Sequence, residues 1–488
     1  MAKYEVKDGV GIIPEGTTVV KYKAFENCAE LTSVVIPEGV TEIEFRAFEN
    51  CTGLTSIVIP ASVTKLGWGL FNGCTQLASI KVAEGNPVYD SREDCNAIIN
   101  TKQNELVAGC KSTVIPSTVT TIGVAAFCDC TGLTELVIPD SVTTIRGSAF
   151  RGCTGLTKLF IPASVTALED YSYNNDGGIF FQPFVGCRNL TSIVVAEDNP
   201  VYDSRNNCNA VLKQGVNGLG NKVSTLVVGC ASTVIPDDVN FIGECAFYGS
   251  AVTEVTLPAS IKDIRHGTFA YCEDLKSIDF GKTLEVVKGD DPYFGKPGAF
   301  QGCKSLEKLF FPASFRFMSS GAFYDCDSLV SIKVDETNER YDSREDCNAV
   351  ISKGTNALIL GCSTTVIPES VTEIEDTAFG HCNGLTEMTL HEGITIVGTQ
   401  VFRFCKGLKS AAVLGPVKDL GCAFYGCKAL ETVTFGAGIK KMDEDMFDTS
   451  PALKAIYVPA KKAAYYKKRL NENVHGLIVE LEPVKKAK

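Results

Sequence analysis

The chain has 488 residues, of which 45% are hydrophobic and 21% charged, a composition typical of a folded protein. Its formal net charge of −12 argues against a nucleic-acid partner, which would require clustered basic residues. The sequence has no apolar run of about 18 residues and so predicts no membrane insertion. Its first residues lack the apolar segment of a secretory signal. The chain is therefore either cytosolic or a mature form whose signal has been removed.

One short pattern, centred on a phenylalanine, recurs along the whole chain. Neighbouring copies are 22 or 23 residues apart wherever nothing is inserted between them. The fourteen phenylalanines are Phe25, Phe48, Phe71, Phe127, Phe150, Phe184, Phe247, Phe269, Phe300, Phe323, Phe379, Phe402, Phe424 and Phe447. A fixed period of this length predicts a solenoid. We expect the fourteen rings to form one continuous internal column.

Cysteines follow the same period. Of the 21 cysteines, twelve stand three residues after the repeat Phe. In the two other copies this position holds Ser250 and Ser450, so it requires a small side chain and not a disulfide partner. Because free cysteine packs as a small hydrophobic residue, the pattern predicts a periodic series of buried, free thiols, a cysteine ladder.

One complete unit spans residues 54–66 and continues into the Phe segment. Ile57 and Ile59 alternate as in a strand, and Pro60 ends that strand because it cannot donate a hydrogen bond to a neighbour. Val63 and Leu66 form a second apolar pair on the returning side. A strand repeated in every coil pairs with its copies in parallel. We therefore expect a parallel sheet along one wall and short turns on the other.

The repeat Leu-x-x-Ile-x-Ile-Pro-x-x-Val-x-x-Ile-x-x-x-Ala-Phe-x-x-Cys resembles the BspA-like class of leucine-rich repeat over residues 20–458. The resemblance implies a mostly β, right-handed leucine-rich-repeat solenoid. Residues 1–19 would then be a partial repeat or cap, and residues 459–488 a C-terminal cap with a basic tail. It also implies a microbial cell-surface or secreted protein that adheres to host matrix proteins or to other cells.

The period stretches three times, near residues 83–116, 196–236 and 335–368. Each of these variant modules contains a related Tyr-Asp-Ser-Arg segment, and we expect each to add one rung. The acidic run from Asp90 to Asp94 could suggest calcium, but Asn206 and Asn207 replace the acids in the second copy. We expect instead a turn held by local side-chain hydrogen bonds.

Two further insertions, residues 169–182 and 288–298, mix acids, glycines and aromatic residues and should project as loops. Most outward positions of the strands are small, but Phe160 and Phe310, each one strand before an insertion, are large. We therefore expect a ligand surface formed by aromatic residues of the two regions. The candidates are Phe160, Tyr171, Tyr173, Phe180, Phe181, Tyr293, Phe294 and Phe310. Alternatively, each loop folds over its own Phe and buries it.

Signatures of catalysis or of a bound metal are missing from the sequence. The four histidines share no motif, and we interpret His381-Cys382 and the Cys128–Cys130 pair as parts of the repeat. The sequence predicts no cofactor and no enzymatic activity. It favours a monomeric binding or adhesion protein whose ligand is a protein or a glycan. The alternative is a structural spacer or an intracellular repeat scaffold.

Overall fold

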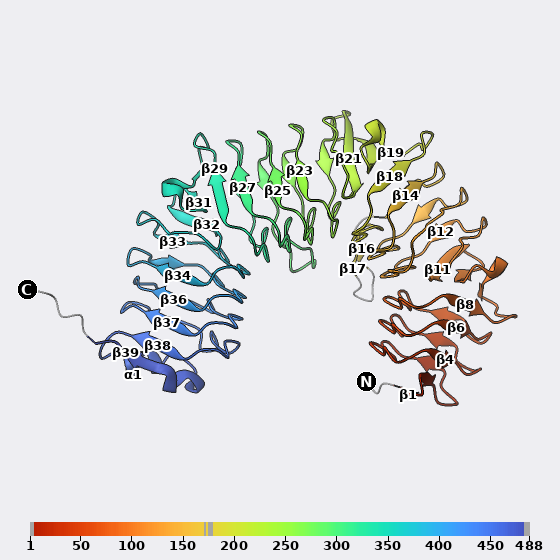
Figure 1. Ribbon diagram of the computed structural model, residues 1–488, viewed down its shortest axis with the longest axis horizontal. Coiled ribbons are helices and arrows are strands. Elements are labelled where there is room, and N and C mark those ends of the chain that lie inside the picture. Colours follow the sequence, from red (N-terminus) through yellow and green to blue (C-terminus); the bar gives the residue numbers. More distant parts are fainter. Residues whose placement is uncertain (1–3, 170–171, 174–178, 483–488) are drawn as a thin grey trace, which may run out of the picture. The chain divides into compact units, whose positions relative to one another are not determined.

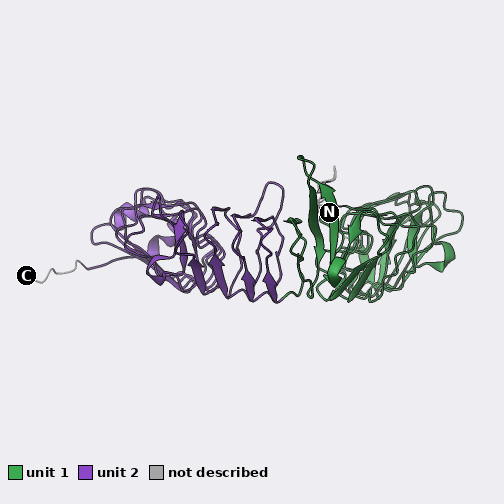
Figure 2. Ribbon diagram, turned by 90° about the horizontal axis from the view of Figure 1, so that it is seen from above, with its two compact units in different colours: residues 1–252 green, residues 253–488 purple. Residues whose placement is uncertain are grey.

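The computed structural model describes residues 4–169, 172–173 and 179–482 (Figure 1). The chain divides into two compact units, residues 1–252 and 253–488 (Figure 2), and each unit is a stack of short coils. A typical coil contributes a longer strand, a two-residue strand and a turn that carries the repeat Phe. We call the two resulting surfaces the long-strand wall and the short-strand wall.

In the first unit the longer strands are β2 (Val10–Ile12), β4 (Ser33–Val35), β6 (Ser56–Ile59), β8 (Ser79–Val82), β14 (Lys158–Ile161) and β18 (Ser192–Val195), preceded by β1 (Glu5–Lys7). The two-residue strands are β3 (Val19–Val20), β5 (Glu42–Ile43), β7 (Lys65–Leu66), β12 (Thr121–Ile122), β13 (Thr144–Ile145), β15 (Ala167–Leu168) and β22 (Phe241–Ile242). The insertion contributes β16 (Ser172–Tyr173) and β17 (Ile179–Phe180).

In the second unit the longer strands are β23 (Glu254–Thr256), β25 (Ser277–Asp279), β27 (Lys308–Phe311), β29 (Ser331–Val334), β34 (Glu387–Leu390), β36 (Ser410–Val413), β37 (Thr432–Phe435), β38 (Ala455–Val458) and β39 (Ile478–Glu480). The two-residue strands are β24 (Asp263–Ile264), β26 (Val286–Val287), β28 (Phe317–Met318), β33 (Glu373–Ile374) and β35 (Ile396–Val397). Near the C-terminus are the short helix α1 (Ala463–Lys467) and the 3₁₀ segment η4 (Glu472–Leu477).

Both walls are parallel sheets. In the long-strand wall Ile57 pairs with Ile80, and both side chains are buried. Val58, which follows Ile57 in the same strand, points outward. In the short-strand wall Ile43 pairs with Leu66. The expected parallel wall is confirmed. The other side holds two-residue strands in most coils in addition to the expected turns; β7 (Lys65–Leu66), for example, includes Leu66 but not Val63.

The variant modules differ from the expected parallel rungs. Each has three antiparallel strands, of which the first two are connected by a 3₁₀ turn and the last two form a hairpin: β9 (Tyr89–Asp90), η1 (Arg92–Asp94), β10 (Ala97–Asn100) and β11 (Glu105–Gly109); β19 (Tyr202–Asp203), η2 (Arg205–Asn207), β20 (Ala210–Val216) and β21 (Lys222–Gly229); β30 (Tyr341–Asp342), η3 (Arg344–Asp346), β31 (Ala349–Ser352) and β32 (Ala357–Gly361). The turn reverses the chain because Glu93 and its counterparts adopt the left-handed conformation. The final strand of each hairpin then rejoins the short-strand wall in parallel.

All fourteen repeat phenylalanines are buried. Within the units their rings stack in runs with centroids 5.0–5.9 Å apart: Phe25–Phe48–Phe71, Phe127–Phe150–Phe184, Phe269–Phe300–Phe323 and Phe379–Phe402–Phe424–Phe447. At the variant modules a glycine lies against the next ring. A Cβ on Gly109 would lie 2.2 Å from Phe127 Cε1, and one on Gly361 would lie 2.1 Å from Phe379 Cε1. The expected continuous column is therefore wrong, since the variant modules divide it into runs.

The cysteines are free, and all but Cys382 and Cys422 are fully buried. In eight coils the thiol donates a hydrogen bond to the backbone carbonyl of the Phe in the preceding Phe-bearing coil, at 2.9–3.3 Å. Burial raises the pKa of Cys187 to about 12, which keeps that thiol protonated and able to donate. The cysteine position therefore connects coils without a covalent bond.

Candidate ligand-binding site

The short-strand wall is interrupted at each variant module. Its sheet ends at β7 in the first unit and at β28 in the second, and the hairpin strands begin a new sheet instead of pairing with them. A tyrosine hydroxyl spans the interruption: Tyr202 accepts a hydrogen bond from Leu168 N at 2.9 Å, and Tyr341 donates to Arg316 O at 3.0 Å. These bonds replace only part of the missing backbone pairing, so each interruption is a place where a cleft can open.

The first two interruptions are filled on the side of the Phe turns. Near Asn72 and Cys128 the remaining space is only about 10 Å³. At the second interruption Phe181 and Val185 pack with Cys245, and the ring of Phe181 lies 5.6 Å from that of Tyr248. The insertion that precedes Phe184 thus closes this gap.

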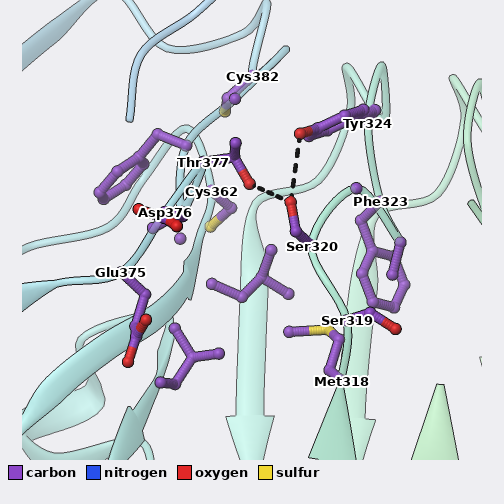
Figure 3. A pocket seen from close by; sticks show the side chains of 18 of the residues that line it. Met318, Ser319, Ser320, Phe323, Tyr324, Cys362, Glu375, Asp376, Thr377 and Cys382 are labelled. Carbon is purple, nitrogen blue, oxygen red and sulfur yellow. Dashed lines mark hydrogen bonds between the residues drawn. The ribbon is translucent and has the colours of Figure 1, made fainter. Parts of the chain in front are cut away.

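The third interruption, between the coils of Phe323 and Phe379, is open and contains a cavity of about 450 Å³ (Figure 3). Apolar and polar groups line it in similar measure, and the apolar ones include Met318, Phe323, Leu360, Phe379 and Cys382. Its hydroxyl groups connect the two sides. Ser320 Oγ lies 2.6 Å from Thr377 Oγ1 and 3.4 Å from the Tyr324 hydroxyl (Figure 3).

Acidic groups lie at the same cavity. Glu375 and Asp376 line it, and burial together with the neighbouring carboxylates of Glu373 and Asp376 raises the pKa of Glu375. Among the described residues, those that line the cavity include no lysine, arginine or histidine. The site therefore combines apolar walls with an excess of negative charge.

The second aromatic insertion is anchored beside this cavity. Gly289 N donates to Ser319 Oγ at 3.0 Å and Asp290 N donates to Ser320 O at 3.1 Å. Both serines line the cavity. Beyond this anchor, Asp291 and Lys296 exchange two backbone hydrogen bonds and close a tight hairpin, with Tyr293 and Phe294 in its tip. Tyr293 is 85% exposed, and the two rings meet edge to face at 4.8 Å.

The structure separates the candidate aromatic residues predicted from the sequence. Phe160 and Phe310 point outward from β14 and β27 and are about half exposed, at 51% and 52%. The insertions follow β15 and β26 in the other wall, so they lie on a different side of the coil from these two rings. The strand and loop aromatics therefore do not share one side of the coil, and their role in binding a ligand stays a prediction. The exposure of Phe310 contradicts the alternative in which its loop buries it.

The remaining predicted residues belong to the first insertion. Phe181 is buried in the gap described above, because it follows β17 and points toward Cys245; it presents no surface to a ligand. Tyr173 and Phe180 lie in β16 and β17, which pair antiparallel. Tyr171 lies outside the described residues. The cavity itself was missed by the sequence reasoning; the stretched period between Phe323 and Phe379 marks the interruption, but the two filled interruptions have the same stretched period.

The geometry of the described residues supports neither a metal site nor a catalytic pair of histidine and cysteine. Within the described ranges, no three His, Cys, Asp or Glu side chains are grouped to hold a metal. Asp90 instead accepts from Arg92 Nε at 2.9 Å, as expected for a turn. His381 Nδ1 lies 3.3 Å from Asp325 Oδ1, and burial raises the pKa of Cys382 to about 12, so that thiol is not a nucleophile at neutral pH. No helix in the described part of the chain has the length and hydropathy of a bilayer span.

A comparison with protein families finds a match to the BspA type leucine-rich repeat region, in six copies covering residues 11–95, 99–199, 226–344 and 358–473. A search of curated proteins finds no match. Solved structures with similarity include a leucine-rich cell surface protein from Faecalibacterium prausnitzii A2-165, 18% identical over 91% of this chain and 84% of that chain, with a TM-score of 0.39. A leucine-rich repeat protein from Bacteroides ovatus is 20% identical over 92% of this chain and 90% of its own, with a TM-score of 0.37.

Proposed function

The chain belongs to the BspA-type leucine-rich repeat family, and from this membership we propose that it is a non-enzymatic adhesion protein that binds a protein ligand through the long-strand wall of residues 1–252. Leucine-rich repeat proteins commonly bind proteins, since a stack of parallel strands offers an extended rigid surface. The proposal includes a monomeric chain located at the cell surface or secreted.

The observation that carries the proposal is a column of exposed apolar side chains. They occupy one outward position of the repeat and range from 42% exposed for Ile12 to 80% for Val137. The column comprises Ile12, Val35, Val58, Val114, Val137, Phe160, Val194 and Val234. Lys81 interrupts it, next to Val58 in the paired strands. Contiguous exposed apolar surface of this kind is typical of protein interaction sites, and an aromatic ring such as Phe160 is a common centre of binding energy.

The second unit has a different surface at the same position. The polar residues Thr256, Asp279, Lys333 and Thr389 stand where most coils of the first unit have aliphatic residues, with Phe310 and Val366 as exposed apolar exceptions. This difference supports a ligand surface on the first unit, because a wall that only supports the stack would not need apolar residues on its solvent side. Phe310, Tyr293 and Phe294 remain candidates for separate contacts.

An array of purified extracellular proteins and glycans, probed with the intact chain, tests the proposal. We expect saturable binding to one or a few proteins, and weaker binding to those proteins when Phe160 is replaced by alanine. Binding only to glycans would contradict a protein ligand. No saturable binding to any arrayed molecule would favour the spacer or scaffold alternative.

A further inference from the structure

The three variant modules create the same defect in the coil stack, and two of these defects are filled on the side of the Phe turns. Asn72 and Cys128 leave about 10 Å³ at the first, and Phe181 occupies the second. At the third a cavity of about 450 Å³ remains. The first defect has an open cleft of about 540 Å³ as well, but it lies on the side of the short strands and is lined by Trp68, Glu105 and Arg146. The third cavity differs because its space reaches the Phe turns, between Phe323 and Phe379.

The size and lining of the third cavity are those of a ligand pocket. Pockets for small molecules typically have volumes of about 300–1,000 Å³, with apolar walls and a few polar groups that orient the ligand. Here Met318, Phe323 and Phe379 supply apolar walls, and Ser320 and Thr377 supply hydroxyl groups (Figure 3).

The charge at the cavity differs from that of the other two modules. The sequence after the two-residue strand is Glu375-Asp376-Thr377 here, Gly123-Val124-Ala125 in the first module and Gly243-Glu244-Cys245 in the second. Two adjacent acids stand at this place only in the third module, and no basic residue among the described ones lines the cavity beside them. A positive group placed between them would relieve their mutual repulsion, while an anion would be repelled.

We propose that the cavity between the coils of Phe323 and Phe379 binds an apolar group that carries a positive charge, such as an aromatic amine. The ring enters between Met318, Phe323 and Phe379, and the ammonium group faces Glu375. The amine is either a free small molecule or a basic residue beside an aromatic residue in a peptide, and both present the same chemistry.

Isothermal titration calorimetry on the full chain tests this, with tryptamine as the cation and indole-3-acetate as an anion with the same ring. We expect saturable binding of tryptamine and binding of indole-3-acetate that is weaker by about tenfold or more. A short peptide with adjacent lysine and tryptophan distinguishes the two sources. If either tryptamine or the peptide binds in preference to indole-3-acetate, the proposal is supported; if neither does, it is wrong.

Substitutions at the cavity test whether the ligand binds there. Glu375→Gln should weaken the binding of the positively charged ligand, and Glu387→Gln should not, because Glu387 points outward from β34 in the long-strand wall and does not line the cavity. Leu360→Trp should fill the cavity and abolish binding; Met318→Trp serves the same purpose if Leu360→Trp does not fold. Unchanged affinity in a folded, cavity-filling variant would overturn the assignment.

Discussion

Three residues after most repeat phenylalanines, a thiol donates a hydrogen bond to the Phe carbonyl of the preceding Phe-bearing coil, as Cys51 does to Phe25. Ser250 and Ser450 occupy the same position, but their hydroxyl groups are buried and find no hydrogen-bond partner in the described part of the chain. The shorter C–O bond keeps the hydroxyl farther from the carbonyl. The position therefore selects cysteine for its length as well as for its small size.

Replacing Ser450 by cysteine should therefore stabilise the protein. A buried hydroxyl without a partner costs about 1–3 kcal/mol, and a hydrogen bond contributes about 0.5–1.5 kcal/mol. We expect Ser450→Cys to raise the urea midpoint of unfolding more than Ser450→Ala, which removes the hydroxyl without adding a donor. A lower midpoint for Ser450→Cys than for the wild type would contradict this account of the position.

The buried thiols also make stability depend on pH. Burial raises the pKa of Cys187 and of Cys427 from the ordinary 9.0 to about 12. The folded state therefore favours the protonated thiol, and this contribution is complete below pH 9 and is lost as the pH rises toward 12. Urea midpoints measured across that range should fall, and fall less steeply when both cysteines are replaced by alanine. Identical slopes in the two proteins would contradict the prediction.

At the scale of the elements, the variant modules explain where the short-strand wall is interrupted. An asparagine fixes the corner before each hairpin: Asn338 Nδ2 donates to Pro312 O at 3.0 Å and to Phe315 O at 2.9 Å, while its Oδ1 accepts from Arg340 N and Tyr341 N. The hairpin then turns the chain back on itself and leaves the short-strand wall interrupted. The interruption at which the cavity lies is a consequence of this one element.

Gly229 should be intolerant of a side chain, because a Cβ there would lie 2.3 Å from Phe247 Cε1. Crowding of this kind costs roughly 1–3 kcal/mol. Gly215 lies in the same hairpin, where a Cβ would meet only Val223 Cγ2 at 3.7 Å. We expect Gly229→Ala to lower the urea midpoint clearly and Gly215→Ala to leave it almost unchanged. Equal effects of the two substitutions would show that the Phe contact is not the cause.

The repeated strands and turns could be predicted from the sequence better than the variant modules and the insertions. The positions of Phe48 and Cys51 follow from the period alone, since every coil repeats the same environment. The reversal at Glu93 could not be inferred, because the pattern marks a turn but not the direction in which the chain leaves it. Phe181 was placed on the surface because composition suggests a loop, whereas the side chain points into the gap beside Cys245.

At the scale of the molecule, each of the two units is a stack of coils that offers one candidate binding surface. The long-strand wall of residues 1–252 exposes the apolar column around Val58 and Phe160. The cavity beside Phe323 lies in residues 253–488. Each surface follows from a local change in the repeat, and each is tested separately by changes that leave the buried Phe and Cys positions intact.

The central claim is that the apolar column of residues 1–252 binds a protein ligand, and a matched pair of triple variants tests it most directly. One variant carries Val35→Lys, Val58→Lys and Val194→Lys; the other carries Ser33→Lys, Ser56→Lys and Ser192→Lys in the same three strands, β4, β6 and β18. Both add the same charge on the outward side of the wall. Surface plasmon resonance against the protein identified on the array should show binding lost in the valine variant and retained in the serine variant, with similar unfolding temperatures. Retained binding in the valine variant, or equal loss in both, would contradict the claim.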